Sequence, residues 1–455
     1  MALCSSQELT EMELKIKMKQ KLHLKAPGNW INDPNGFIYY KGKYHLFYQY
    51  FPYEPRWGTM HWGHAVSDDL LTWEHKGIAL FPSKYADQNG CFSGSAVEAD
   101  GRMYLFYTGV HFHETNPEDI HVCLNDQFES AQLMITSEDG FDFDNAKGKK
   151  VIIPPLLNPE IGDKTHTRDP KVWRGKDAWY MVLGSLSKER KGKLLIYRSE
   201  NLTDWEYKNS VTKEEGFGWM WECPDYFEVD NEKVLIFSPM GILEEEGAYE
   251  NQAICTLVDF EEESCKMTIP DTYQFLDYGQ DLYAPQSTVD KDGNRVVVAW
   301  LRMPKPVEGK WIGMFSLPRV VEVCKGHIYF RLHPEVKKAY NKKINAVTQA
   351  HESGYCISMD LQEQEMIDVG GYKIFRKDDC IHTDRSEVFA GCKDYRTQCA
   401  TPALKDGCHV DIYVDDNLVE VFVNDGEYVI SNAVYGLKKE LHTDSKEKTE
   451  IYTVE

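Results

Sequence analysis

Two aspartates each stand directly before a proline, a setting that keeps a side chain out of regular strand pairing. Asp33 precedes Pro34 within residues 30–36, and Asp169 precedes Pro170. Proline fixes φ and removes a backbone donor, so each pair interrupts a hydrogen-bonded ladder and holds its carboxylate rigidly. Rigid carboxylates suit chemistry that uses paired carboxyl groups. Taken alone, however, an Asp-Pro pair is more often an ordinary Asx turn.

A third carboxylate has unusual neighbours. Glu222 stands between Trp221 and Cys223 and is followed by Pro224. Apolar surroundings disfavour the anion, so they favour the protonated carboxyl that a general acid needs near neutral pH. The alternative is a buried structural glutamate that is satisfied by a partner.

These three residues precede members of a repeated hairpin. Each hairpin joins two strands rich in aromatic and β-branched residues through a turn containing Gly, Asn or Asp, residues that tolerate positive φ. The turns recur about every 55 to 75 residues, the length of a four-stranded sheet with its loops. The repeat predicts an all-β chain with a five-bladed β-propeller over residues 21–322; a β-sandwich with unrelated hairpins is the alternative. The hairpins lie at 39–48, 97–107, 173–182, 227–237 and 289–298.

The rest of the chain has a different texture. After Pro318 the composition changes: residues 320–455 are richer in lysine and polar residues, and hydrophobic alternation returns at 409–414 and 418–423. Period-two alternation with short turns predicts a C-terminal β-sandwich over residues 323–455. Residues 1–20 are expected to form a tail or a short helix.

The predicted propeller brings the three carboxylates together. The first strand of each blade lines the central channel, and Asp33, Asp169 and Glu222 precede the hairpins of blades one, three and four. They are therefore expected to converge at one mouth of the channel. Two carboxyl groups that flank a scissile bond are the arrangement of glycosidases.

The motifs around these residues resemble those of glycoside hydrolase family 32, which includes invertases, inulinases and sucrose-6-phosphate hydrolases. The resemblance covers nearly the whole chain from about residue 21 and implies a fold of propeller followed by sandwich. It rests on the segments 30–36, 61–67, 69–73, 92–95, 168–170, 222–224, 283–286, 317–319 and 419–426.

The resemblance also implies roles. Asp33 would be the nucleophile, Glu222 the acid and then the base, and Asp169 a stabiliser of the transition state. Retention would need the nucleophile and the acid to stand about 5 to 5.5 Å apart. Double displacement would release β-D-fructose from the non-reducing end of sucrose or sucrose 6-phosphate. The expected substrate-binding residues are Trp30, Asn32, Gln49, Trp57, Phe92, Ser93 and Arg168.

Other functions remain open from the sequence. A fructan hydrolase or a fructosyltransferase would use the same carboxylates with a different leaving group or acceptor. An inactive sugar-binding propeller is a third alternative. A phosphate on the substrate would need basic or backbone donors at the outer rim of the pocket, where the candidates are Arg302, Lys305 and Lys310.

The composition of the chain argues against several classes of binding partner. The net charge of -22 argues against nucleic acid and anionic membranes, which require basic surfaces. The chain has no long apolar run, no apolar signal-peptide segment at its start and no cysteine spacing typical of zinc, so we expect no membrane span, no metal and no cofactor. The 12 cysteines are expected to be free thiols in a cytoplasmic protein. A homodimer is compatible with the sequence.

Overall fold

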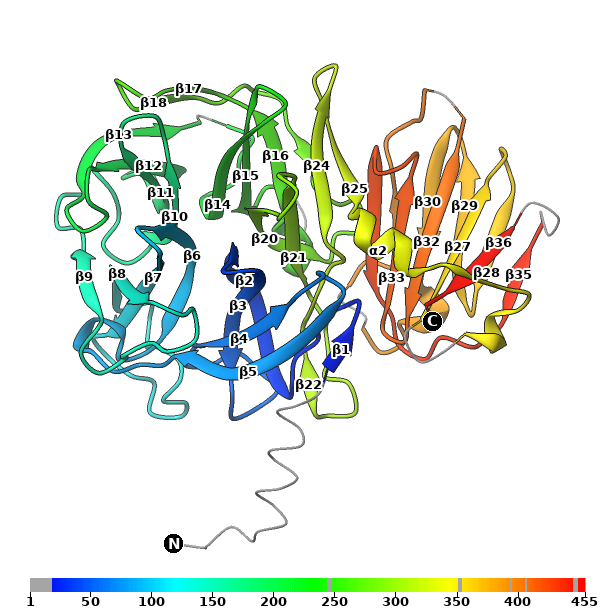
Figure 1. Cartoon of the computed structure of the whole chain (residues 1–455), viewed down its shortest axis with the longest axis horizontal. Helices are drawn as coiled ribbons and strands as arrows, with labels where there is room; N and C mark the ends of the chain where they lie inside the picture. The colour runs from blue at the N-terminus through cyan, green and yellow to red at the C-terminus, as the bar shows by residue number, and fades with distance from the viewer. Residues whose placement is uncertain are drawn as a thin grey trace, which may run out of the picture.

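A computed structural model describes residues 19–213, 215–243, 247–350, 354–392, 395–405, 407–444 and 449–454. Five sheets are arranged in a ring, and two further sheets pack face to face beside them (Figure 1). The predicted all-β class, a five-bladed propeller followed by a sandwich, is confirmed. The tail or helix expected at residues 1–20 lies outside the described residues, apart from the start of β1 (Lys19–Lys21).

The first two blades form the blue and cyan part of the ring in Figure 1. Blade one runs outward from its inner strand and carries β1 at its outer edge; its strands are β2 (Asn29–Tyr40), β3 (Lys43–Phe51), β4 (His61–Ser67) and β5 (Thr72–Leu80). Blade two consists of β6 (Cys91–Ala99), β7 (Arg102–Phe112), β8 (Phe128–Ser137) and β9 (Lys150–Ile153).

Three more blades complete the ring. Blade three consists of β10 (Arg168–Arg174), β11 (Trp179–Leu186), β12 (Gly192–Ser199) and β13 (Glu206–Thr212). Blade four consists of β14 (Met220–Val229), β15 (Glu232–Met240), β16 (Ile254–Leu257) and β19 (Gln274–Phe275), with the hairpin of β17 (Asp259–Glu261) and β18 (Lys266–Thr268) beside it. Blade five consists of β20 (Leu282–Val289), β21 (Arg295–Leu301), β24 (Arg319–Cys324) and β25 (His327–Leu332), and β23 (Met314–Phe315) pairs with β21. β22 (Trp311–Ile312) pairs in parallel with β2 and so joins the last blade to the first.

The hairpins follow from their turn residues. Lys41 and Gly42 both have positive φ, as do Asp100 and Gly101 in the next blade. Two consecutive residues with positive φ make the tight turn whose twist matches that of paired strands. In these two blades the short turn therefore fixes the first strand against the second.

Every inner strand is interrupted at the same place. In each, two residues stand outside the pairing register with the neighbouring strand, between Ile31 and Pro34, Cys91 and Gly94, Arg168 and Lys171, Glu222 and Asp225, and Tyr283 and Gln286. Prolines stand at or beside four of these interruptions because a residue outside the ladder needs no N–H donor. The residues at the interruptions include Asp33, Ser93, Asp169 and Cys223.

The C-terminal sandwich has two antiparallel sheets. One contains β26 (Lys342–Ile344), β27 (Tyr355–Asp360), β32 (His409–Asp415), β33 (Leu418–Val423), β34 (Tyr428–Ala433) and β36 (Glu450–Thr453). The other contains β28 (Met366–Val369), β29 (Tyr372–Lys377), β30 (Cys380–Asp384), β31 (Gln398–Ala400) and β35 (Leu441–Thr443). Their facing aliphatic side chains form one buried core. The short helix α2 (Pro334–Ala339) lies between the last blade and the sandwich.

We place the end of the propeller later than the expected boundary. The expected boundary at residues 322–323 falls inside β24, which pairs with both β21 and β25. The polar texture after Pro318 belongs to this outer hairpin, in which every second residue of β25 is partly exposed. We propose that the propeller ends after Leu332.

Buried charges join the two parts. His23 contacts Asp415 at 3.0 Å and Glu420 at 2.9 Å, and Arg319 donates to Glu420 at 2.7 Å. Burial lowers the pKa of His23, but the two carboxylates outweigh burial and raise the pKa above its ordinary value. A mostly apolar core shared by blade five and the sandwich surrounds this contact.

No helix in the described part of the chain is long and apolar enough to cross a membrane.

Candidate active site

Asp33 lies at the interruption in β2, and three side chains fix it. Ser93 Oγ donates to Asp33 Oδ2 at 2.5 Å, and Asn32 Nδ2 donates to Oδ1 at 3.0 Å. Trp30 Nε1 in turn donates to Asn32 Oδ1 at 2.7 Å, which fixes the orientation of the amide. Burial raises the pKa of Asp33, the hydrogen bond from Ser93 opposes this, and the charge of Glu222 adds to it. Asp33 is thus an oriented carboxyl group with few solvent contacts.

Asp169 occupies the equivalent interruption in β10. Its φ is +64°, a conformation that is rare outside glycine, and Thr108 Oγ1 accepts its backbone N–H at 2.9 Å. The Cys223 N–H donates to Asp169 Oδ2 at 2.9 Å, and Arg168 Nε lies 3.9 Å from the same oxygen. Burial raises the pKa of Asp169 to about 7, although Arg168 opposes the rise. Backbone strain at a fixed carboxylate is a feature of functional sites.

Glu222 stands at the start of the interruption in β14. Arg168 donates to Oε1 through Nη2 at 2.8 Å and Nε at 3.2 Å, and the Tyr283 hydroxyl donates to Oε2 at 2.7 Å. The apolar surroundings expected from Trp221 and Cys223 are therefore not what the carboxyl group meets. The backbone changes direction here, so the neighbours in sequence point elsewhere and both oxygens have polar partners. Burial raises the pKa of Tyr283 well above its ordinary value, so its hydroxyl remains a donor.

Cys223 links the two aspartates. Its Sγ lies 3.5 Å from Asp33 Oδ2 and 3.7 Å from Asp169 Oδ2, and its own φ is +47°. Burial, together with these carboxylates, raises the pKa of the Cys223 thiol well above its ordinary value. The thiol therefore stays protonated and acts as a weak donor, not as a nucleophile. Through Cys223 and Arg168, the three carboxylates from blades one, three and four form one cluster.

Side-chain hydrogen bonds connect three blades next to the cluster. The Gln286 side chain accepts the Phe37 N–H at 2.8 Å and donates to the Gly94 carbonyl at 2.8 Å, while Asn35 Oδ1 accepts the Gly94 N–H at 3.1 Å. Blades five, one and two are therefore tied together at the residue next to Ser93. This tie fixes the distance between the Ser93 hydroxyl and the carboxylate that it orients.

Three other expected binding residues have partners outside the carboxylate cluster. Gln49 on β3 is buried, and its Nε2 donates to the Cys91 carbonyl at 3.0 Å. Trp57 is 36% exposed, and its ring meets that of Phe92 edge-on at 6.0 Å between centroids. The two rings form an apolar pair beside the inner strand of blade two. Gln49, Trp57 and Phe92 therefore have contacts of their own and are not hydrogen-bonded to the carboxylate cluster.

Tyr283 is a residue of the site that we did not predict. A signal for it was present, because Arg168, Glu222 and Tyr283 each stand two residues before a proline. The same interruption follows each of them, and it brings all three side chains to one contact around Glu222. Comparing the inner strands position by position would have found Tyr283.

The cluster combines three carboxyl groups with the guanidinium of Arg168. Among the described residues, no three His, Cys, Asp or Glu side chains gather in a way that could hold a metal. The positive charge beside the carboxylates comes from Arg168. The arrangement offers one carboxyl group oriented by neutral donors, a second that accepts from a cation and a hydroxyl, and a third that contacts Cys223 and Arg168.

Comparisons with known proteins agree with this geometry. The model for the glycosyl hydrolases family 32 N-terminal domain matches residues 23–334, and the model for the C-terminal domain of the same family matches residues 371–454. The chain belongs to glycoside hydrolase family 32. The predicted family and the predicted enzyme class, a glycosidase of the β-fructofuranosidase type, are confirmed.

Alignments with curated relatives and solved structures cover almost the whole of this chain. A sucrose-6-phosphate hydrolase of Bacillus subtilis is 34% identical over 445 residues, covering 91% of this chain and 88% of that protein. A raffinose invertase of Escherichia coli is 34% identical over 446 residues, with the same coverage. The structure of a Bombyx mori family 32 beta-fructofuranosidase has a TM-score of 0.81 at 27% identity, covering 98% of this chain and 97% of that one.

Proposed function

We propose that the cluster cleaves the fructosyl bond of sucrose or sucrose 6-phosphate, with Asp33 as nucleophile, Glu222 as acid and base, and Asp169 as stabiliser. The observation that carries these roles is the different partnering of the three carboxyl groups. Asp33 is oriented by neutral donors, whereas Glu222 is held by a cation and a hydroxyl. Neutral donors leave a carboxylate nucleophilic, while the guanidinium of Arg168 and the hydroxyl of Tyr283 hold Glu222 in one orientation for proton transfer.

The first step would form a covalent fructosyl-enzyme. An Asp33 oxygen attacks the anomeric carbon while Glu222 protonates the departing oxygen, so the glycosidic bond breaks and glucose or glucose 6-phosphate leaves. Positive charge develops on the fructosyl ring, and Asp169 in its ionised form supplies the opposing charge.

The second step returns the enzyme to its starting state. Glu222 is now ionised, with Arg168 and Tyr283 donating to it, and takes a proton from water. The water attacks the anomeric carbon, and the bond to Asp33 breaks. Two inversions give β-D-fructose with net retention.

The phosphorylated substrate is the open question at the leaving-group side. The relatives named sucrose-6-phosphate hydrolases motivate it. The three basic residues suggested from the sequence do not form a rim: Arg302 is buried, Lys305 donates to the Ala390 carbonyl at 3.1 Å, and Lys310 pairs with Glu308 at 2.7 Å.

The eleven described cysteines are free, which supports the proposal of a cytoplasmic, reducing setting.

The test compares fructose release from sucrose and from sucrose 6-phosphate by the wild type and by Asp33→Ala and Glu222→Gln. Both variants should lose about a thousandfold or more of turnover while remaining folded. NMR of the first product should reveal the β anomer of fructose. Near-normal turnover by Asp33→Ala would refute the assigned nucleophile, and the ratio of kcat/KM for the two substrates would decide whether phosphate is recognised.

A further inference from the structure

We propose that Arg385, in the sandwich, is a positioning residue for the acid Glu222 and acts through Asp281, Arg302 and Tyr283. This inference rests on the proposed role of Glu222. It gives the C-terminal sandwich a part in catalysis although no described residue of the sandwich belongs to the carboxylate cluster.

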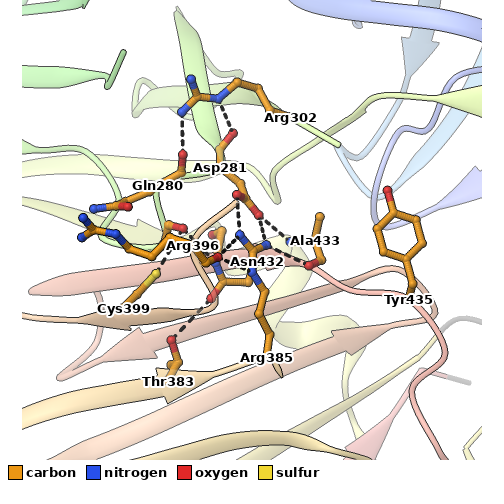
Figure 2. Close-up of polar contacts among 12 residues, drawn as sticks. Gln280, Asp281, Arg302, Thr383, Arg385, Arg396, Cys399, Asn432, Ala433 and Tyr435 are labelled. Carbon is orange, nitrogen blue, oxygen red and sulfur yellow. Dashed lines mark hydrogen bonds and ion pairs between the residues drawn. The ribbon is translucent and has the colours of Figure 1, made fainter. Parts of the chain in front are cut away.

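The chain of contacts begins inside the sandwich. Arg385 follows β30 and its side chain is 0% exposed. Its guanidinium forms a bidentate ion pair with the Asp281 carboxylate, in which Nη2 donates to Oδ1 at 3.0 Å and Nη1 donates to Oδ2. The Ala433 N–H adds a hydrogen bond to Asp281 Oδ2 at 2.9 Å. A fork of parallel donors fixes a carboxylate in orientation as well as in position (Figure 2).

The second link is the backbone on either side of the Asp281 α-carbon. Arg302 Nη2 donates to the Gln280 carbonyl at 2.5 Å, and Arg302 Nε donates to the Asp281 carbonyl at 3.3 Å (Figure 2). The Arg302 N–H also donates to the Asp281 carbonyl, at 2.9 Å. Because the Arg385 pair fixes Asp281, it also fixes the two carbonyls that orient the Arg302 guanidinium.

The third link reaches the active site. The Arg302 guanidinium lies over the Tyr283 ring, 4.9 Å from its centroid. A cation over an aromatic face is attracted to it, and more strongly where both are shielded from water, as they are here. Tyr283 itself stands two residues after Asp281, on β20. Its ring is therefore held from above by Arg302 and along the chain by Asp281.

The Tyr283 hydroxyl is placed to serve both protonation states of Glu222. It lies 2.7 Å from Glu222 Oε2 and 3.0 Å from the Ser238 carbonyl, and it has one hydrogen. When Glu222 is ionised, the hydrogen points to Glu222. When Glu222 carries its proton, the hydroxyl turns to Ser238 and accepts from Glu222. An acid that becomes a base within one turnover needs such a two-way partner, and the partner works only if its ring stays in place.

The experiment separates acid catalysis from overall integrity by changing the leaving group. Sucrose has a poor leaving group that needs protonation, whereas p-nitrophenyl β-D-fructofuranoside has one that leaves without it. Arg385→Lys and Tyr283→Phe should each lower kcat/KM for sucrose about tenfold or more, because a shift of about 1 Å in an oriented group costs that much. The same variants should change kcat/KM for the aryl fructoside less than about threefold.

The double variant and a matched control test the route. If Arg385 acts through Tyr283, Arg385→Lys combined with Tyr283→Phe should be no slower than Tyr283→Phe alone. His23→Gln removes another buried charge contact between propeller and sandwich but leaves residues 280–283 untouched, so it should change neither substrate's kcat/KM. If Arg385→Lys does not fold, Arg302→Met, which keeps the side-chain volume, tests the same route from its middle.

Equal losses on both substrates, no loss on sucrose, or independent effects in the double variant would each overturn the proposal. The Glu222→Gln variant distinguishes this outcome from failure of the proposed function. If Glu222→Gln retains sucrose turnover, the assigned acid is wrong. Glu222→Gln could lower kcat/KM for sucrose but leave kcat/KM for the aryl fructoside unchanged. If Arg385→Lys then behaves like the wild type, only the positioning role fails.

Discussion

Asp169→Asn should make the protein more stable at neutral pH while removing its activity. Asp169 has a pKa of about 7 in the folded chain, against an ordinary value of 3.8, chiefly because it is buried. Between these two values the unfolded chain gives up the proton and the folded chain keeps it, so the aspartate destabilises the fold increasingly as pH rises. Above pH 7 this cost is constant. Asparagine cannot ionise, and its carbonyl can still accept the Cys223 N–H.

The magnitude follows from the shift. About three pKa units at about 1.4 kcal/mol each amount to about 4 kcal/mol, of which about 3 kcal/mol develops between pH 4.5 and 8. Guanidinium unfolding, followed by tryptophan fluorescence at pH 4.5, 6 and 8, measures the free energy of unfolding of both proteins. The advantage of the variant should grow with pH, and its turnover should fall about a thousandfold. Loss of packing or of a hydrogen bond would give a difference that is the same at every pH, and a pH-independent gap would refute the reasoning.

Two further predictions concern the inner strand of blade two. Ser93→Ala removes the donor to Asp33 Oδ2, so the pKa of Asp33 should rise and the acidic limb of the kcat/KM profile should move up by about one pH unit; an unmoved limb would contradict the role of Ser93. Gly94→Ala places a Cβ 1.9 Å from the Phe106 carbonyl oxygen, and the free energy of unfolding should fall by about 3 kcal/mol or more, because backbone on both sides would have to move. Gly407→Ala, where a Cβ meets nothing within 4 Å, is the control and should leave unfolding nearly unchanged.

The sequence could predict what depends on local pattern. Turn residues with positive φ and alternating strands revealed the hairpins, and their spacing revealed the ring. Asp33, Asp169 and Glu222 could be grouped because each stands at the same place relative to a hairpin. Convergence then followed from the geometry of a propeller, without knowledge of any single contact.

What the sequence could not supply was the direction of side chains at the interruptions. The sequence predicted apolar surroundings for Glu222 because its chain neighbours are Trp221 and Cys223. The positive φ of Cys223 turns the strand, however, so that Glu222 accepts hydrogen bonds from Arg168 and Tyr283. Arg302 looked like a surface cation because arginines usually are. Its burial depends on Asp281, which is held in turn by a sandwich residue about a hundred positions away in sequence, and no local pattern carries that information.

The repeated interruption of the inner strands also bears on how such a site can change over time. Each blade offers an equivalent short stretch whose side chains are released from pairing, while the paired residues on either side carry the structure. In blade two the stretch supplies Ser93, in blade three Asp169 and in blade four Cys223. Substitutions in these stretches can exchange reactive groups without disturbing a hydrogen-bonded ladder, so selection can alter the chemistry and the scaffold separately. The propeller is in this respect an evolvable platform, in which reactivity is set blade by blade.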